Sequence, residues 1–253
     1  MNPIKILTYN LRRDNDADGI NSFTNRFPFI IDTLHLNKPD VIGFQEAKPE
    51  MLARLKASLE EYSFVGFGRN PDYSSEANPV AFLKSRFSLH GFEQFWLSLT
   101  PHVPGSRYED QSTCPRICVF TILKPDDGEP FRFVNTHLDH FSASARLSGA
   151  ELILSRLKEQ NALSPLPTIL TGDLNERPGS PAVTMLAESG FTDLTVGIRR
   201  TAHHFGRQTF DNKIDYIFAT SSVCARNTRE WTDMRGEQYL SDHFPVQTVV
   251  TAY

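Results

Sequence analysis

Thr168-Ile169-Leu170-Thr171-Gly172-Asp173-Leu174-Asn175 is the stretch from which the fold can be worked out. It begins as a short apolar run with two β-branched residues, which predicts a buried strand that Gly172 ends. Side chains two positions apart in an extended chain point the same way, so Asp173 and Asn175 project together from the end of this strand. Open α/β sheets usually place their functional sites at the carboxyl ends of their strands.

A carboxylate beside an amide can hold and activate a water molecule against a phosphate group. The alternative interpretation of Asp173 and Asn175 is an ordinary turn, because Gly, Asp and Asn are common turn residues. The rest of the chain decides between the two.

Polar side chains stand at or near the ends of several other strand-like segments. Together with the first pair, these residues are Asn10, Glu46, His137, Asp173, Asn175, Asp215, Asp242 and His243. Each one alone has a structural explanation, such as a turn cap, a charge at a helix start or a packed histidine. Strands that end alike in one sheet sandwich can pool their side chains in one cleft, and the combination favours such a site.

Strand-like and helix-like segments alternate along the chain. The expected strands cover residues 4–9, 40–46, 80–84, 116–123, 131–137, 168–170, 213–218 and 246–250. The expected helices cover residues 27–36, with Pro28 in the first turn, a segment that starts at Pro49, a segment that contains Arg146, and a segment between Ser180 and Gly190. This alternation predicts an α/β or α+β sandwich.

Two long polar loops, 69–79 with Glu76 and 100–115, interrupt these elements. Long loops in a compact domain are often functional. The chain contains no internal repeat, linker or low-complexity segment, so residues 1–253 are interpreted as one domain.

Composition restricts the class of protein. The chain has 253 residues, of which 40% are hydrophobic and 22% charged, which is typical of a protein with a sizeable core. Its net charge of -4 argues against a broad electrostatic grip on nucleic acid. An acidic balance suits a pocket of carboxylates that a divalent cation neutralises.

The three cysteines, Cys114, Cys118 and Cys224, have neither the number nor the spacing of a disulfide framework or a zinc site. We expect all three to be reduced thiols. The first residues lack the apolar core of a signal peptide, and no run approaches the length of a membrane span. A cytoplasmic location is therefore the default expectation.

Six ordered motifs resemble those of the endonuclease/exonuclease/phosphatase superfamily, to which deoxyribonuclease I belongs. The motifs are Thr8-Tyr9-Asn10, Phe44-Gln45-Glu46, Asn135-Thr136-His137-Leu138, Gly172-Asp173-Leu174-Asn175, Ile214-Asp215-Tyr216-Ile217 and Ser241-Asp242-His243-Phe244-Pro245. The resemblance covers essentially the whole chain. It implies a four-layer α/β sandwich of two packed mixed β-sheets flanked by helices.

The resemblance also implies a metal-dependent enzyme. Glu46 is similar to the main Mg²⁺ ligand of the family, and Asn10 and Asp242 are expected near the metal. Mn²⁺ is an expected substitute. Mg²⁺ prefers hard oxygen ligands and keeps several waters, so one or two carboxylates suffice to hold it.

The same resemblance implies the catalytic roles. Asp173 corresponds to the residue that orients or deprotonates the attacking water, and Asn175 to a contact with phosphate or water. His243 is expected on the scissile phosphate, with Asp215 as its hydrogen-bonded partner. His137 resembles a second histidine on the phosphate. Direct attack by water is expected, without a covalent enzyme intermediate.

Four further residues are expected to contact substrate or to support such contacts. Glu76 is the best match for a loop carboxylate that supports His137, and Arg116 for an arginine near the phosphate. His140 and Arg146 follow His137 in a pattern that most resembles bacterial relatives grouped near the nocturnin-type deadenylases.

The identity of the substrate stays open at this stage. The first expectation is a nuclease acting on single-stranded or terminal nucleic acid, with aromatic residues such as Phe95, Trp96, Tyr108, Phe141 and Phe205 available for base stacking unless they belong to the core. The alternatives are a phosphatase or phosphodiesterase for a small or lipid phosphate, and an inactive binding scaffold. A scaffold is disfavoured because a binder gains little from a water-activating carboxylate. A monomer is the default expectation.

Overall fold

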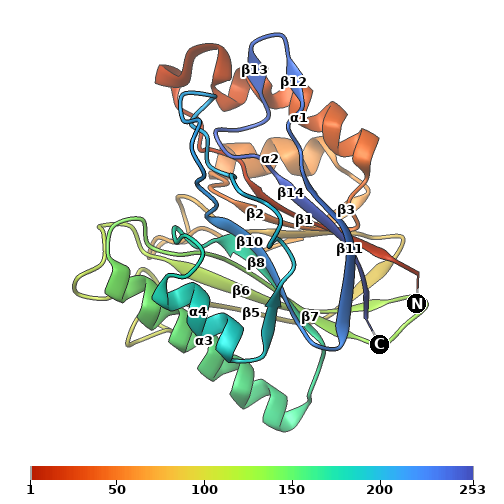
Figure 1. The fold of residues 1–253 in the computed structure, drawn as a ribbon, viewed down its shortest axis with the longest axis vertical. Coiled ribbons are helices and arrows are strands. Elements are labelled where there is room, and N and C mark those ends of the chain that lie inside the picture. Colours follow the sequence, from red (N-terminus) through yellow and green to blue (C-terminus); the bar gives the residue numbers. More distant parts are fainter. Residues whose placement is uncertain (1, 253) are drawn as a thin grey trace.

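Two six-stranded β-sheets lie face to face in the computed structural model, which describes residues 2–252 (Figure 1). The first sheet has the spatial order β11 (Val223–Glu230), β14 (Val246–Ala252), β1 (Ile4–Asn10), β2 (Val41–Gln45), β4 (Val80–Leu83) and β3 (Tyr62–Val65). The second has the order β5 (Phe87–Trp96), β6 (Ile117–Pro125), β7 (Phe131–His137), β8 (Thr168–Asp173), β10 (Asp215–Thr220) and β9 (Phe191–Asp193). Both sheets are mixed, because β1–β2 and β7–β8 pair in parallel whereas the other pairs are antiparallel.

Helices cover the outer face of each sheet (Figure 1). The first sheet carries α1 (Phe23–Asn37) and α2 (Pro49–Ser58), and the second carries α3 (Ala143–Leu163) and α4 (Pro181–Glu188). A short 3-10 helix, η1 (Asp16–Asn21), precedes α1, and β12 (Met234–Arg235) and β13 (Gln238–Tyr239) form a small separate hairpin. This arrangement confirms the expected four-layer sandwich. None of the helices in residues 2–252 combines the length and apolarity that a membrane crossing requires.

Three apolar clusters separate the four layers. Side chains alternate along β1, so Ile4 and Ile6 enter the cluster between the sheets whereas Leu7 and Tyr9 pack beneath α1 and α2. The third cluster lies between the second sheet and helices α3 and α4. Burial of these clusters is the main force that holds the layers together.

The space between the sheets becomes polar close to the strand ends that carry the site. Gln45 donates from Nε2 to Oδ1 of Asn135 on the opposite sheet at 2.8 Å, and Asn135 donates in return to the carbonyl of Phe44 at 2.8 Å. Gly43 lets the sheets approach here, since a Cβ at that position would lie 2.4 Å from Oγ1 of Thr171. Such paired polar groups fix the alignment of the two sheets, because an unpaired buried amide is costly.

Several element boundaries differ from those predicted. Helix α1 begins at Phe23 rather than at residue 27, so Pro28 lies inside the helix and not in its first turn. The sequence pattern missed β3, β5, β9 and β11. Strands β3, β5 and β11 carry several partly or fully exposed side chains and β9 has only three residues, so none produces a long buried run. The cysteines are free thiols, with Cys118 buried and Cys224 exposed.

Candidate active site

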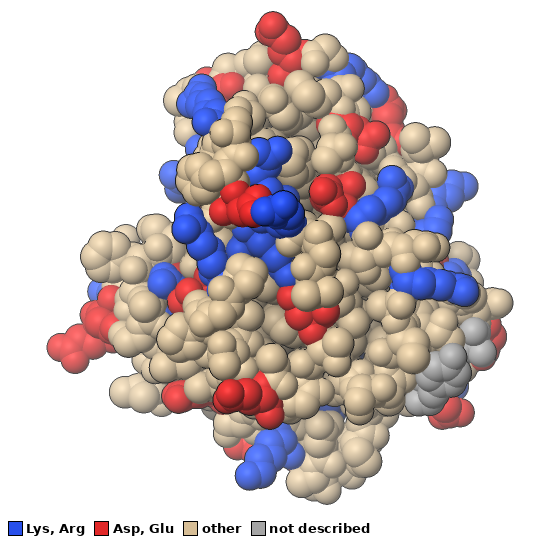
Figure 2. Space-filling model, in the orientation of Figure 1, with Lys and Arg blue, Asp and Glu red and all other residues tan. Residues whose placement is uncertain are grey.

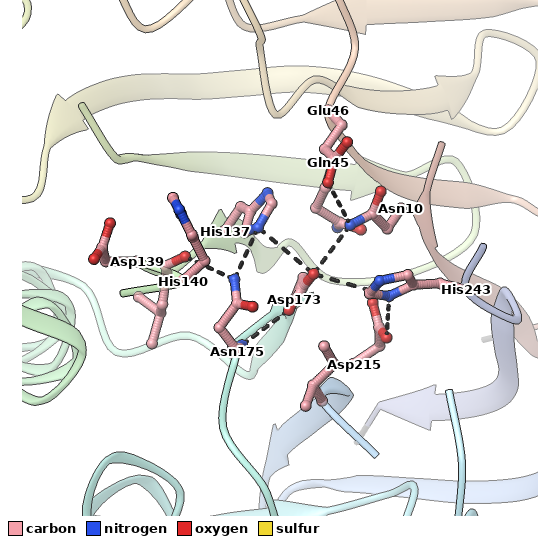
Figure 3. Close-up of polar contacts among 12 residues, drawn as sticks. Asn10, Gln45, Glu46, His137, Asp139, His140, Asp173, Asn175, Asp215 and His243 are labelled. Atoms are coloured by element: carbon pink, nitrogen blue, oxygen red, sulfur yellow. Dashed lines mark hydrogen bonds and ion pairs between the residues drawn. The ribbon is translucent and has the colours of Figure 1, made fainter. Parts of the chain in front are cut away.

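The strand registers bring the predicted polar residues to one place. Within the second sheet, Asp173 at the end of β8 lies opposite His137 on β7 and opposite Asp215 on β10. Within the first sheet, Asn10 at the end of β1 lies opposite Gln45, which directly precedes Glu46. Because the sheets face each other, these ends converge (Figure 3).

Asn10 joins the two halves of the site. Its Nδ2 donates to Oε1 of Glu46 at 3.2 Å and to Oδ2 of Asp173 at 3.0 Å, while its Oδ1 accepts from the backbone N–H of Arg12 at 2.9 Å. The other carboxylate oxygen of Glu46 accepts from the backbone N–H of Arg13 at 2.9 Å. Burial would raise the pKa of Glu46, but this backbone hydrogen bond, the charge of His243 and the bond from Asn10 together lower it. Glu46 is therefore held as an anion.

Asp173 sits at the centre of the site. Its Oδ1 accepts from the backbone N–H of Asn175 at 2.8 Å, and Asn175 itself has a left-handed backbone conformation. Burial and the nearby charge of Asp215 raise the pKa of Asp173 to about 7. A carboxylate with such a pKa can accept a proton near neutral pH.

His243 and Asp215 form the direct hydrogen bond that the resemblance led us to expect, with Nδ1 of His243 2.8 Å from Oδ2 of Asp215. Burial alone would lower the pKa of His243, but the charge of Asp215 and this hydrogen bond raise it well above its usual value. The imidazole is therefore held in its charged form, with its other nitrogen free for a further contact.

His137 is held differently. The Asn175 amide donates from Nδ2 to the carbonyl of Leu138 at 3.1 Å and lies 3.0 Å from Nε2 of His137, so this ring nitrogen acts as an acceptor. Burial, together with the charges of Arg116 and Arg69, lowers the pKa of His137 well below its usual value. His137 is thus a neutral imidazole oriented by Asn175, whose amide is used inside the protein rather than left free for phosphate.

The cleft above these residues has a volume of about 500 Å³. Four arginines, four histidines and four carboxylates line it, with Ser112, Thr113, Cys114 and Asn175 completing the wall. The arginines are Arg12, Arg13, Arg69 and Arg116, the histidines are His137, His140, His204 and His243, and the carboxylates belong to Glu46, Glu76, Asp173 and Asp242. The volume falls within the range of ~300–1,000 Å³ that small-molecule sites usually have.

Two of the residues expected to contact or support the substrate have other partners in the structure. Glu76 lines the cleft, but its carboxylate pairs with Arg69 at 2.9 Å and lies 3.7 Å from Arg13. His137 contacts Asn175 and Asp173 instead. The loop folds back on itself here, and a charged arginine is a stronger partner for a carboxylate than a neutral imidazole.

Arg146 does not line the cleft. Its guanidinium pairs with Glu176 at 2.6 Å and donates to the carbonyl of Asp139 at 3.0 Å. It lies on the first turns of α3 and contacts the segment that follows β7. Arg116 and His140, by contrast, do line the cleft, and Nη2 of Arg116 lies 2.7 Å from Nδ1 of His140.

The sequence interpretation missed Arg12, Arg13, Arg69 and His204 as lining residues. Arg12 and Arg13 follow Asn10 directly, and their closeness to a strand end was the signal that could have revealed them. Arg69 and His204 lie in loops whose path depends on tertiary packing. No predicted strand end stands close to them in the sequence to indicate that they line the cleft.

Two groups of side chains offer metal ligands. One ligand atom from each of Asp173, Asp215 and His243 lies within 4.8 Å of the others, but His243 and Asp215 already satisfy each other through a hydrogen bond. The other group is Glu46 with Asp242. Burial raises the pKa of Asp242, the charge of His243 opposes this, and the charge of Glu46 raises it further. One buried and one half-buried carboxylate that repel each other fit a hard divalent cation, which would relieve that repulsion.

Comparison with known proteins identifies a family and a shared fold. A model of the Endonuclease/Exonuclease/phosphatase family matches residues 7–243. A family member from Bacteroides vulgatus is 28% identical over 100% of both chains, with a TM-score of 0.93. The mannosyl-6-phosphatase of Bacteroides thetaiotaomicron is 29% identical over 98% of this chain and 99% of its own, with a TM-score of 0.89. The human nocturnin catalytic domain, 18% identical over 99% of this chain and 94% of its own with a TM-score of 0.75, shares the fold.

Proposed function

The chain belongs to the endonuclease/exonuclease/phosphatase family of phosphoester hydrolases, and on this premise we propose that it is a metal-dependent phosphatase that releases phosphate from small phosphorylated molecules. The lining of the cleft carries this proposal. Within residues 2–252, every side chain that lines it is charged, polar or a thiol, and none belongs to Phe, Tyr, Trp or an aliphatic residue. Such a wall suits a small, hydrophilic, strongly anionic substrate.

A nuclease would need surfaces on which bases can stack, and the aromatic residues considered for this purpose lie elsewhere. Phe95 and Trp96 are buried in the protein, and the hydroxyl of Tyr108 donates to the carbonyl of Ser148. Phe205 packs near Tyr239 and Arg26. Phe141 is 76% exposed, but it is not among the lining residues. The structure therefore favours the small-phosphate alternative over the nuclease that was the first expectation.

The surface supports the same choice. On the face seen in Figure 2, basic and acidic side chains are interspersed, and no broad basic track crosses it. Proteins that bind nucleic acid backbones strongly present clustered Lys and Arg side chains. The similarity to a mannosyl-6-phosphatase along nearly the whole of both chains adds support.

Mg²⁺ is the metal that the donor chemistry fits best, with Mn²⁺ as a substitute. We assign its coordination to Glu46 and Asp242. Asn10 positions Glu46 and Asp173, because its Nδ2 contacts both carboxylates and its oxygen is occupied by the N–H of Arg12. When bound, the cation would supply positive charge at the phosphate and polarise one of its oxygens.

The residues of this chain then divide the work of direct water attack. Asp173 accepts the proton of the attacking water, for which a pKa of about 7 suits it. The charged imidazole of His243 stabilises the negative charge that develops on the phosphate, and Asp215 keeps it protonated and oriented. His137 lies 3.5 Å from Asp173 through Nε2 and contributes a neutral, fixed wall beside the water.

A substrate panel tests the proposal. The purified protein with Mg²⁺ is given p-nitrophenyl phosphate, bis(p-nitrophenyl) phosphate, hexose 6-phosphates, nucleoside monophosphates and end-labelled single-stranded oligonucleotides. We expect phosphate release from the monoesters and little reaction with the diester. Faster cleavage of the oligonucleotides than of every monoester would restore the nuclease interpretation instead.

A further inference from the structure

Arg116 has hydrogen-bonding capacity that the reaction centre does not use. The residue is 4% exposed and lines the cleft, yet its Nε and Nη1 atoms have no hydrogen-bond partner within residues 2–252. Buried N–H groups of a charged guanidinium are expensive to leave unpaired. A buried arginine with two unused donor atoms beside a cleft therefore indicates room for an anionic ligand.

The neighbouring acid does not supply that partner. Oδ2 of Asp139 lies 3.5 Å from Nε of Arg116, but the geometry is not that of a hydrogen bond. Asp139 is instead occupied by the backbone N–H and hydroxyl of Ser112 and by the backbone N–H groups of Phe141 and Ser142. The carboxylate oxygens of Asp139 are therefore occupied by hydrogen bonds that hold the loop around Arg116.

A second arginine faces the same part of the cleft. Arg69 is 7% exposed and pairs with Glu76, whose carboxylate also lies 3.7 Å from Arg13. Glu76 and Asp139 are the acids that form ion pairs with Arg13, Arg69 and Arg116 in this part of the cleft. Burial and the charge of Arg69 both lower the pKa of Arg116, so the two guanidinium groups repel each other. An anion between them would remove that repulsion.

His140 adds a directed donor. Arginine can only donate, so Nδ1 of His140, 2.7 Å from Nη2 of Arg116, must accept, and the ring proton is placed on Nε2. The ring is exposed and lines the cleft, so it can present this N–H to a ligand. Burial and the charge of Arg116 lower the pKa of His140, which keeps the ring neutral.

His140 lies beside the reaction centre. Figure 3 shows His140 on the side of His137 that faces away from His243. Asp173 lies between His137 and His243. An anion bound by Arg116 and His140 would accordingly belong to a different part of the substrate from the phosphate that reacts at Asp173 and His243.

We propose that Arg116, Arg69 and His140 form a second anion subsite, which selects small phosphorylated sugars or polyols that carry a further phosphate or carboxylate group. The proposal rests on the phosphatase function and narrows its substrate class. A phosphate and a carboxylate would both bind through anionic oxygens, and the substrates of the test distinguish the two groups.

The test compares phosphate monoesters without a second anionic group with phosphorylated sugars that carry one. Activity is measured on glucose 6-phosphate, glucose 1,6-bisphosphate, 6-phosphogluconate and p-nitrophenyl phosphate for the wild type and for Arg116→Gln. We expect the wild type to prefer one of the doubly anionic substrates, and Arg116→Gln to reduce that preference about 10- to 100-fold, the scale of losing hydrogen bonds to a charged group. Arg146 contacts Asp139 but does not line the cleft, so Arg146→Gln is the matched control and should keep the preference for a second anion.

Two results would overturn the subsite. One is a wild type with no preference for a second anion, and the other is an equal loss on all four substrates in Arg116→Gln, which would place Arg116 on the reacting phosphate. Calorimetric titration of Asp173→Asn with the same sugar phosphates separates this outcome from failure of the phosphatase proposal. If Asp173→Asn binds a doubly anionic ligand more tightly than a singly anionic one, and the double variant Asp173→Asn/Arg116→Gln loses this difference, the subsite is supported even if no monoester is hydrolysed. Equal binding of singly and doubly anionic ligands contradicts it.

Discussion

His243 and Asp215 are 28 positions apart in the chain but are joined by a hydrogen bond of 2.8 Å between Nδ1 and Oδ2. Asp215 also lies opposite Asp173 in the register of β8 and β10. One carboxylate therefore acts on two neighbours in the same direction, because its negative charge raises the pKa of both the histidine and the other aspartate.

Asp215→Asn should shift both limbs of the pH profile of kcat/KM toward lower pH. Asp173 works when deprotonated, so activity rises as pH passes its pKa, and loss of the Asp215 charge lowers that pKa from about 7. His243 works when protonated, so activity falls as pH passes its pKa, which loss of Asp215 also lowers. The profile is measured at saturating Mg²⁺. An alkaline limb that stays in place or moves upward contradicts the pairing.

The same pair should behave as one unit. His243→Ala is expected to cost about as much in kcat as Asp215→Asn combined with His243→Ala, because residues that act together give non-additive losses. Steady-state kinetics of the two single variants and the double variant measure this. Independent, additive losses would require separate roles for the two residues.

Asp173→Asn should lower kcat by roughly 10²- to 10⁴-fold, the usual effect of losing a general base, while leaving binding of the substrate nearly unchanged. The amide keeps the shape of the carboxylate but cannot accept a proton. Single-turnover kinetics give the rate, and calorimetry gives the affinity. If kcat stays near the wild-type value, Asp173 is a turn residue and not the base.

Removal of the metal should abolish activity, and Glu46→Gln should weaken Mg²⁺ binding, because the amide replaces a hard anionic ligand. Metal affinity is read from calorimetric titration and activity from assays with excess chelator. Glu50→Gln, at the start of α2, is the control and should bind Mg²⁺ as the wild type does. Full activity in excess chelator would refute the metal mechanism.

The layers of the fold could be predicted because the buried strands β1, β2, β7 and β8 leave plain apolar runs that end in polar residues. The edge strands could not be predicted, since their solvent-exposed side chains interrupt the apolar pattern of a buried strand. Within the site, residues at strand ends were identified because a strand fixes the direction of its side chains. The ionic partners of Glu76 and Arg146 were not predicted, because these residues lie on a loop and a helix start, where the backbone path depends on tertiary packing.

Gly43→Ala should destabilise the protein by about 1–3 kcal/mol, the usual cost of overpacking a core. The added Cβ would lie 2.4 Å from Oγ1 of Thr171 and 2.6 Å from Oδ1 of Asn135, two atoms of the hydrogen-bonded layer between the sheets. Chemical denaturation measures the free energy of unfolding. Gly197→Ala, where a Cβ meets nothing within 4 Å, is the control. Equal stability of the two variants would show that the sheets do not meet as closely as described.

Thr201 links two segments of the site, and no motif in the sequence pointed to it. It is fully buried, and its Oγ1 accepts from the backbone N–H groups of Ile214 at 3.0 Å and Asp215 at 3.1 Å. Its carbonyl accepts from the N–H of Phe244 at 2.8 Å, so one residue ties the segment of Asp215 to the segment of His243.

Thr201→Val should lower kcat on the order of 10-fold with little change in KM, because small displacements of aligned catalytic groups reduce rate more than binding. Valine has the shape of threonine but leaves two backbone N–H groups without an acceptor, which also lowers the free energy of unfolding by about 1–3 kcal/mol. Thr201→Ser retains the hydroxyl and should restore most of kcat. Steady-state kinetics and chemical denaturation of both variants make the comparison. A valine variant that is less stable yet has wild-type kcat would limit Thr201 to folding, whereas rescue by serine alone ties its hydroxyl to the alignment of Asp215 with His243.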